Sequence, residues 1–261
     1  MTKALFFDID GTLVSLQTLA IPNSAIAALE RAKANGTKIF ISTGRPTQIM
    51  NNIGALQERR LIDGYITMNG AYCYVGDEVI YKSPVPAADV HTLANLCRQN
   101  GYCSIFVGEK DIKVCQPNDE VRHIFFEFLR VNEISESSFE EATRGEIYQI
   151  TPFFSPEAQE HIAPLMPGSE FGRWHPAFVD ITRKDNTKRL GMEHIQRHFG
   201  ISPSETMAFG DGGNDIAMLQ YAAIGIAMGN ASETVKAAAD YVTENAENDG
   251  IALALEHFGV I

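Results

Sequence analysis

The sequence predicts an α/β protein with a three-layer, parallel-sheet core into which a separate α+β domain is inserted. Short apolar runs alternate with amphipathic helical stretches near the start of the chain and again near its end, and this alternation breaks in between. Strands that alternate with helices pair in parallel through right-handed crossovers, which places helices on both faces of the sheet. A chain of 261 residues is also long enough for two domains.

The first part of the core is expected over residues 1–83. Asn23 or Ser24 can cap a helix that runs to Gly36, and Pro46 is well placed to begin the next helix. Apolar runs that flank these helices predict three buried strands, at 5–7, 38–42 and 65–68. A β-hairpin follows, since 71–75 and 78–82 flank the two-residue connection Gly76-Asp77.

A second domain is expected over residues 84–183, where the pattern changes to an α+β one. It consists of a helix, a hairpin at 103–107 and 112–115, a helix, a strand at 147–150, a helix, and strands near 171 and 178–181. The first rhythm then resumes over 184–261, so the core is discontinuous and Rossmann-like. Its remaining elements are a helix to His198, strands at 206–209, 224–228 and 241–242, and helices from Asp215, from Ser232 and at the end.

Composition excludes several classes of protein. With 45% apolar and 21% charged residues the chain is an ordinary globular one. A net charge of −12 opposes binding to nucleic acid or to an anionic membrane. No apolar run suits a signal peptide or a membrane span, so we expect a cytoplasmic protein. We also expect a monomer. Four cysteines without a C-x-x-C pair are expected to be buried thiols.

Three polar clusters follow three of the expected strands. Parallel α/β sheets bind ligands in the crevice beyond the carboxyl ends of their strands, so these clusters should project over one edge of the sheet. They are Asp8-Ile9-Asp10-Gly11-Thr12, Ser42-Thr43-Gly44-Arg45 and Gly210-Asp211-Gly212-Gly213-Asn214-Asp215.

Asp8 and Asp10 can lean toward the same space, because side chains repeat every two residues along an extended segment. Two carboxylates 4 Å apart repel by about 4 kcal/mol at an effective dielectric constant near 20, which raises one pKa or requires a cation. Asp211 and Asp215 should reach the same place. Four carboxylates without cysteine or histidine favour a hard cation, Mg²⁺ above all.

Lys188, at the start of a core helix, can supply the opposite charge, and Thr43 with the backbone around Gly44 can supply uncharged donors. Together with a cation they suit a phosphoryl group. Asp8 can then attack phosphorus to form an aspartyl-phosphate, while Asp10 protonates the leaving oxygen and later deprotonates water.

These residues resemble the four motifs of the haloacid dehalogenase superfamily of phosphotransferases, and most closely the Cof-type phosphatases of subclass IIB. The resemblance implies a core at 1–83 and 184–261 and a cap domain at 84–183 that closes over the site and selects the substrate. It also implies a Mg²⁺-dependent phosphatase that hydrolyses small phosphomonoesters, sugar phosphates in particular, through an aspartyl-phosphate. The alternatives are a phosphosugar mutase on the same scaffold and a non-catalytic sensor of a phosphorylated ligand.

The resemblance also implies a role for each motif residue. Asp8 is the nucleophile, Asp10 is the general acid/base, and Thr43 and Lys188 hold the phosphoryl group. The metal would be bound by the Asp8 carboxylate, the Asp10 carbonyl and Asp211. Asp215 and Asn214 would support these groups through water or hydrogen bonds.

Several assignments remain open in the sequence. Arg45 contacts either the phosphoryl group or substrate, or forms an ion pair, and Asn69 is either a turn former or a site residue. Arg189 stands where the family commonly has glycine, so Lys184 competes with Lys188 for the phosphate. Asp215 could instead cap the helix after it. Trp174, His175 and Asp180 are candidates to line the substrate pocket of the cap.

Overall fold

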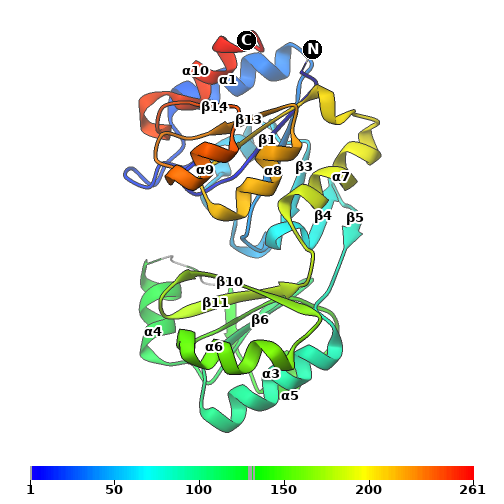
Figure 1. The fold of residues 1–261 in the computed structure, drawn as a ribbon, viewed down its shortest axis with the longest axis vertical. Helices are drawn as coiled ribbons and strands as arrows, with labels where there is room; N and C mark the ends of the chain where they lie inside the picture. Colours follow the sequence, from blue (N-terminus) through cyan, green and yellow to red (C-terminus); the bar gives the residue numbers. More distant parts are fainter. Residues whose placement is uncertain (1, 129–130, 132) are drawn as a thin grey trace. The chain divides into compact units, whose positions relative to one another are not determined.

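The chain divides into two compact units in the computed structural model, which describes residues 2–128, 131 and 133–261. Unit 1 contains Met1–Arg45, Met50–Lys82 and Thr187–Ile261. Unit 2 contains Ser83–Asn186 together with the short segment Pro46–Ile49. Each unit has its own sheet and its own apolar core (Figure 1).

Unit 1 is built on an eight-stranded sheet of order β14-β13-β12-β1-β2-β3-β4-β5. The strands from β14 to β3 are parallel, and the hairpin of β4 and β5 continues the sheet in antiparallel fashion. The predicted α/β core is confirmed. The strands are β1 (Ala4–Phe7), β2 (Lys38–Ser42), β3 (Gly64–Thr67), β4 (Tyr72–Val75), β5 (Glu78–Lys82), β12 (Thr206–Gly210), β13 (Ile224–Ala227) and β14 (Tyr241–Val242).

Helices cover both faces of this sheet, because the side chains of its strands alternate between two apolar clusters. Leu5 and Phe7 of β1 belong to one cluster, and Ala4 and Phe6 belong to the other. The first face is covered by α1 (Asn23–Ala34), α2 (Gly54–Glu58) and α10 (Gly250–His257). The second is covered by α7 (Lys188–Phe199), α8 (Ile216–Tyr221) and α9 (Glu233–Ala238).

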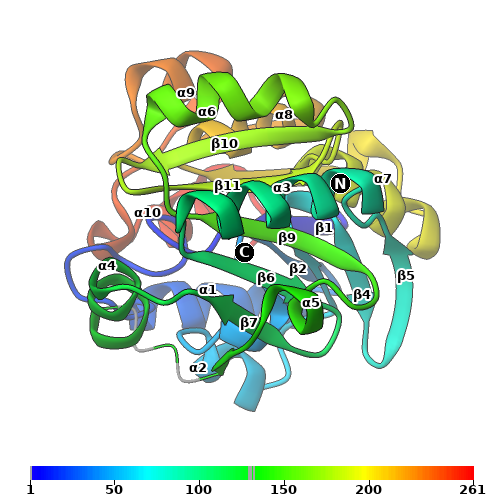
Figure 2. The ribbon, with the colours of Figure 1, turned by 90° about the horizontal axis from the view of Figure 1, so that it is seen from below.

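Unit 2 is an α+β domain on a six-stranded sheet of order β10-β11-β9-β6-β7-β8 (Figure 2). One face packs on α3 (Ala87–Asn100), α5 (Phe139–Ala142) and α6 (Pro156–Ile162). Phe125, from a π-helix at Arg122–Phe128 that follows α4 (Asp119–Val121), packs on Phe153 and Phe178. The strands are β6 (Ser104–Gly108), β7 (Ile112–Cys115), β8 (Ile134–Glu136), β9 (Ile147–Pro152), β10 (Ser169–His175) and β11 (Phe178–Arg183).

Local structure differs from the expectations in three places. The helix expected from Pro46 is only a 3-10 turn at Thr47–Ile49, and α2 begins at Gly54. Asn52 lies between this turn and α2. Its side-chain amide donates a hydrogen bond to Asp10, outside its own segment, and does not support a helix. Neither Asn23 nor Ser24 caps α1, since the Ser24 hydroxyl donates to Asp249. The short strand β8 has no counterpart among the elements expected from the sequence.

The cysteine prediction is confirmed: all four thiols are free and buried. Burial raises the pKa of Cys73, Cys97 and Cys103 to about 12, so these thiols are protonated at neutral pH. None of the helices in the described part of the chain is long and apolar enough to cross a membrane.

Candidate active site

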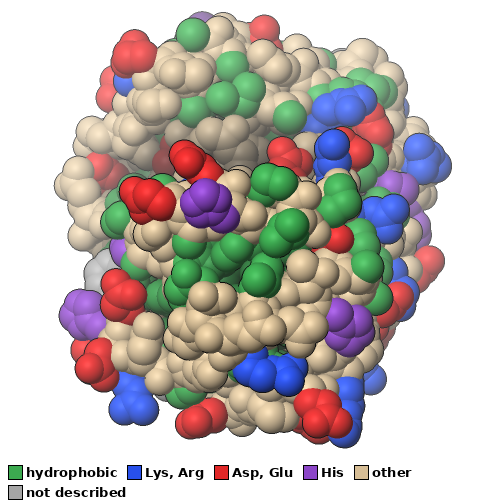
Figure 3. Space-filling model, turned by 60° about the horizontal axis from the view of Figure 1, so that its bottom comes forward, with side chains coloured by type: hydrophobic (Ala, Val, Ile, Leu, Met, Phe, Trp, Pro, Cys, Tyr) green, Lys and Arg blue, Asp and Glu red, His purple; other side chains and the backbone are tan. Residues whose placement is uncertain are grey.

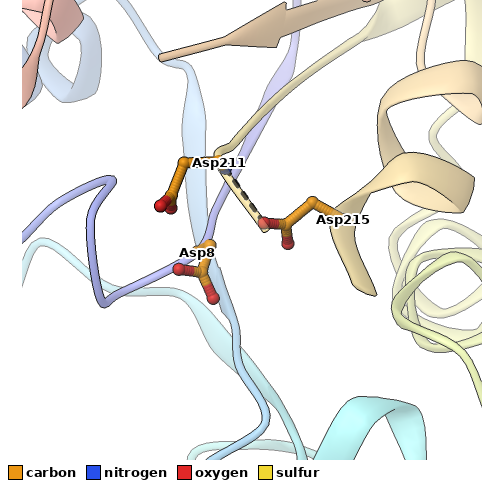
Figure 4. A group of neighbouring side chains, drawn as sticks. All are labelled: Asp8, Asp211 and Asp215. Carbon is orange, nitrogen blue, oxygen red and sulfur yellow. Dashed lines mark hydrogen bonds between the residues drawn. The ribbon is translucent and has the colours of Figure 1, made fainter. Parts of the chain in front are cut away.

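The candidate site lies at the carboxyl ends of three neighbouring strands. β1 pairs with β12 on one side and with β2 on the other. Asp8 directly follows β1, Thr43 directly follows β2, and Asp211 directly follows β12. Asp8, Asp211 and Asp215 each offer a carboxylate oxygen to one cluster, with these atoms within 4.8 Å of one another (Figure 4).

The ammonium group of Lys188 contacts two of these carboxylates. Its Nζ donates to Asp8 Oδ1 at 2.5 Å and to Asp215 Oδ1 at 2.6 Å, and its side chain is 0% exposed. Lys188 opens α7, where the hydroxyl of the N-cap Thr187 accepts from the Leu190 amide at 3.2 Å. Lys184, the alternative from the sequence, is exposed and belongs to unit 2.

Gly191 allows α7 to approach β3 closely enough for this contact. A Cβ at position 191 would lie 2.3 Å from a methyl group of Ile66. The helix could then not keep its present distance from the sheet, so the glycine fixes how deeply the Lys188 ammonium enters the site.

The pKa values of the two ion-pair partners reflect this burial. The pKa of Asp8 lies well above its usual value, because burial and the nearby Asp215 and Asp211 outweigh the lowering effect of Lys188. Burial alone would lower the pKa of Lys188, but the carboxylates of Asp215 and Asp8 outweigh it and raise that pKa above its usual value. Lys188 is therefore a permanent cation.

Asp215 uses both of its oxygens within the protein. Oδ2 accepts from the backbone amides of Asp211 at 3.0 Å and Gly212 at 2.9 Å, while Oδ1 accepts from Lys188. Its side chain does not act as the N-cap of α8, but by accepting from the Gly212 amide it completes a capping box on the 3-10 turn Gly213–Asp215 that leads into α8. Asp215 also fixes the loop after β12 and the lysine.

Asp211 is oriented by two residues that the sequence analysis did not single out. Thr12 Oγ1 donates to Asp211 Oδ1 at 2.8 Å, and Asn230 Nδ2 donates to Oδ2 at 3.1 Å. Burial, together with the neighbouring Asp215, raises the pKa of Asp211 to about 6. Thr12 belongs to the first polar cluster, and Asn230 follows β13. The expectation that ligands bind beyond the carboxyl ends of the strands therefore points to both residues.

Gly11 lets the backbone pass close to the Asp211 side chain, which a residue with a Cβ atom would prevent. Its φ is +87°, and a Cβ at this position would lie 2.2 Å from Asp211 Oδ2. The glycine therefore turns the chain after Asp10 and leaves room for the Asp211 carboxylate.

The donor set fits a divalent cation. Asp8, Asp211 and Asp215 place three carboxylates around the single ammonium of Lys188, which leaves an excess of negative charge when all are ionised. Burial, together with this excess of negative charge, raises the pKa values of Asp8 and Asp211, and a hard, oxygen-binding cation would relieve the excess.

Asp10 lies apart from this cluster and has a counter-ion of its own. Arg45 Nε donates to Asp10 Oδ2 at 2.6 Å and Arg45 Nη2 donates to Oδ1 at 2.9 Å. Asn52 Nδ2 donates to the same Oδ1 at 3.2 Å. The ion pair left open for Arg45 is thus present, with Asp10 as the partner. Nothing in the sequence pattern singled out Asn52.

Asn69 connects two of the strand-end loops. Its amide donates to the Thr43 carbonyl at 3.0 Å, and its Oδ1 accepts from Asn214 Nδ2 at 2.9 Å. A Cβ on Gly44 would lie 3.3 Å from the Asn69 amide group. Asn69 has a φ of +53°, which is typical of a turn, so it is a turn former. Through the contacts above it is also a neighbour of the site residues.

Unit 2 contains a pocket of about 600 Å³ at one end of its sheet. His175 lines it, whereas Asp180 does not and accepts a hydrogen bond from Thr151 at 2.6 Å. The side chain of Trp174 lies outside the described part of the structure. The lining residues are Asp119, Glu120, His123, Ile124, His175, Pro176 and Ala177.

Comparisons with known proteins agree with this geometry. The family model of the haloacid dehalogenase-like hydrolases matches residues 5–255. A solved structure of the HAD subclass IIB sugar phosphatase BT4131 is 59% identical, covers all of both chains and has a TM-score of 0.94. The phosphatase BT1666 from Bacteroides thetaiotaomicron is 37% identical, covering 100% of this chain and 96% of that one, with a TM-score of 0.89. The 5-amino-6-(5-phospho-D-ribitylamino)uracil phosphatase YitU of Bacillus subtilis (strain 168) is 25% identical, covering 96% of this chain and 95% of that one.

The contact between Gly11 and Asp211 leads to a first prediction. Gly11→Ala should abolish most of the affinity for Mg²⁺, because the new methyl group displaces the Asp211 carboxylate. Gly36→Ala is the matched control: Gly36 has nearly the same φ, +85°, but nothing within 4 Å of its Cβ position. It should lose about 1–2 kcal/mol of folding stability and no Mg²⁺ affinity. Titration calorimetry measures both, and unchanged Mg²⁺ affinity in Gly11→Ala would contradict the assignment.

The pKa of Asp211 leads to a second prediction. A proton and a cation compete for the same carboxylate, so Mg²⁺ affinity should be constant above pH 7 and weaken as the pH falls through 6. Competition at Asp211 alone gives about a tenfold loss for each pH unit below 6. Calorimetric titrations at pH 5, 6 and 7 test this, and equal affinities at the three pH values would show that Asp211 is not a ligand.

Proposed function

This chain belongs to the haloacid dehalogenase-like hydrolases and is a phosphatase; from that premise we propose that it hydrolyses small phosphomonoesters, sugar phosphates in particular, through an aspartyl-phosphate on Asp8 and with Mg²⁺. Its 59% identity to a subclass IIB sugar phosphatase supports this class of substrate. The resemblance to Cof-type phosphatases that the four motifs indicated is thereby confirmed.

One observation carries the proposal: the two oxygens of Asp8 have different surroundings. Oδ1 is held by the ammonium of Lys188, and Oδ2 accepts no hydrogen bond from any residue that the structure describes. Asp8 is almost buried, with 7% of its surface exposed, so water does not compete freely for this oxygen. A fixed carboxylate with one open oxygen is arranged to act as a nucleophile.

The reaction then takes two steps. In the first, Asp8 Oδ2 forms a bond to phosphorus, the bond between phosphorus and the ester oxygen breaks, and Asp10 gives that oxygen a proton. In the second, Asp10 takes a proton from water, the water oxygen bonds to phosphorus, and the bond to Asp8 breaks. Inorganic phosphate is released and both aspartates return to their starting states.

The residues present indicate how charge is balanced during this reaction. Mg²⁺ would be held by the carboxylates of Asp8 and Asp211 and the backbone carbonyl of Asp10, and when bound it neutralises phosphoryl charge. Asp215 acts through hydrogen bonds, since both of its oxygens are occupied. Lys188, Thr43, the backbone at Gly44 and Asn214 would donate to the phosphoryl oxygens.

Unit 2 is proposed to be a cap that selects the substrate. All the residues assigned to the phosphoryl group belong to unit 1, whereas the pocket that includes His175 belongs entirely to unit 2. Chemistry and substrate choice would then be divided between the two units.

The partner is proposed to be a small molecule acted on by a cytoplasmic, monomeric enzyme, with neither nucleic acid nor membrane involved. The net charge is −12. On the face shown in Figure 3, Lys and Arg side chains are scattered among acidic ones and are not gathered into one band. Both features disfavour a polyanionic partner.

The covalent route predicts that Asp8→Asn abolishes phosphate release and leaves the fold intact, because the amide keeps the shape of the carboxylate but not its nucleophilicity. Asp77→Asn, an exposed aspartate in the turn between β4 and β5, is the matched control and should keep wild-type activity. Phosphate release is measured with Mg²⁺ over a panel of sugar, nucleotide and aryl phosphates. No bisphosphate activator is added, so that a mutase would stay inactive. Substantial turnover by Asp8→Asn would refute the proposal.

The cap proposal predicts that His175→Ala changes the ratio of kcat/KM values among sugar phosphates, while kcat for an aryl phosphate changes less than about threefold. His91→Ala, on an exposed position of α3 in the same unit, is the control and should leave both quantities unchanged. A common factor of loss across all substrates would show that His175 serves stability and not selection.

A further inference from the structure

We propose that Asn52 and Arg45 are positioning residues that hold the Asp10 side chain for proton transfer, and that Arg45 acts through Asp10 and not by binding the phosphoryl group. The inference rests on the proposed function, in which Asp10 exchanges protons with the leaving group and with water. It assigns a role to Asn52, which stands outside all four sequence motifs.

Three donors fix the orientation of the Asp10 carboxylate. Arg45 approaches with two nitrogens, at 2.6 Å and 2.9 Å, and Asn52 adds a third hydrogen bond at 3.2 Å. A two-pronged arginine contact defines the plane of the carboxylate as well as its position. The Asp10 side chain is 39% exposed, so without these contacts water would let it rotate among rotamers.

Arg45 is itself held in place through its backbone. Its amide donates to Thr43 Oγ1 at 3.0 Å, and its carbonyl accepts from the Met68 amide at 3.2 Å. The guanidinium therefore projects from an anchored point beside the site. Since Nε and Nη2 are both engaged by Asp10, this pair of nitrogens could not hold a phosphoryl group in the same two-pronged way without leaving Asp10.

Asn52 shows that the contact to Asp10 serves more than stability. Its Nδ2 donates to Asp10, but its Oδ1 is buried and has no hydrogen-bond partner in the described structure. An unpaired buried acceptor destabilises a fold, and an apolar side chain of similar size would avoid that cost. The donor function of the amide toward Asp10 explains why the chain tolerates it.

The experiment compares two substrates that differ in their need for a proton. The ester oxygen of glucose 6-phosphate must be protonated as it leaves, whereas p-nitrophenolate leaves readily without a proton. Asn52→Ala should lower kcat for glucose 6-phosphate about tenfold and kcat for p-nitrophenyl phosphate less than threefold, and Arg45→Lys should give the same pattern. Inhibition by inorganic phosphate, which reports binding of the phosphoryl group, should not change.

Two further variants separate positioning from stability. Asn51→Ala changes the exposed neighbouring asparagine and should behave as wild type with both substrates. Asn52→Leu keeps the branching of the side chain at Cγ and removes the unpaired oxygen together with the donor. It should unfold at the same or a higher temperature than wild type and still lose activity selectively on glucose 6-phosphate.

Each other outcome overturns the inference in a distinct way. Equal losses on both substrates would assign Asn52 a structural role. Weaker inhibition by phosphate in Arg45→Lys would show that Arg45 binds the phosphoryl group directly. A wild-type enzyme that hydrolyses neither substrate would refute the proposed function and this inference with it, whereas active wild type with unaltered variants would refute the inference alone.

Discussion

The ion pairs between the buried ammonium of Lys188 and the carboxylates of Asp8 and Asp215 are the interaction on which the rest of the site depends. Removing one partner from such a buried pair costs about 3–5 kcal/mol, because the other charge is left without compensation. Lys188 therefore ties together the start of α7, the end of β1 and the loop after β12, three segments far apart in the sequence. The same contact leaves one Asp8 oxygen open and holds the other, so the constraint that stabilises the site also prepares it for reaction.

Four chemically identical carboxylates acquire different roles because each has different partners. Asp8 faces a lysine, Asp10 faces an arginine and an asparagine amide, and Asp215 faces two backbone amides and the lysine. Among the described residues, Asp211 accepts side-chain hydrogen bonds from the neutral donors of Thr12 and Asn230, and burial raises its pKa to about 6. A carboxylate that is held only by neutral donors keeps its negative charge available to a metal ion, whereas Asp10, which is proposed to exchange protons, has a counter-ion of its own.

The strand ends could be predicted from the sequence because strand periodicity and the position of polar residues after apolar runs are local properties. The structure brings together Asp8, Lys188, Asp211 and Asp215 as expected. Contacts made across the fold could not be predicted in this way. Asn52 reaches Asp10 only because the helix expected from Pro46 is interrupted. Asn51, Asn52 and Gly54 have low helix propensity, but propensity does not show which distant side chain Asn52 contacts. The partner of Arg45 was likewise open, since an arginine that follows a strand can turn toward a phosphoryl group or toward a carboxylate, and its direction depends on packing.

In the proposed reaction, Asp8 carries the phosphoryl group. Rapid mixing with a ³²P-labelled sugar phosphate and Mg²⁺, followed by an acid quench, tests it most directly: one sample is counted for labelled protein, and a second is reduced with borohydride. Borohydride converts an aspartyl-phosphate to homoserine, which peptide mass spectrometry locates in the chain. The account predicts transient label on the protein and homoserine at position 8, with neither in Asp8→Asn. Release of labelled phosphate at full rate without labelled protein, or homoserine at another position, would contradict it.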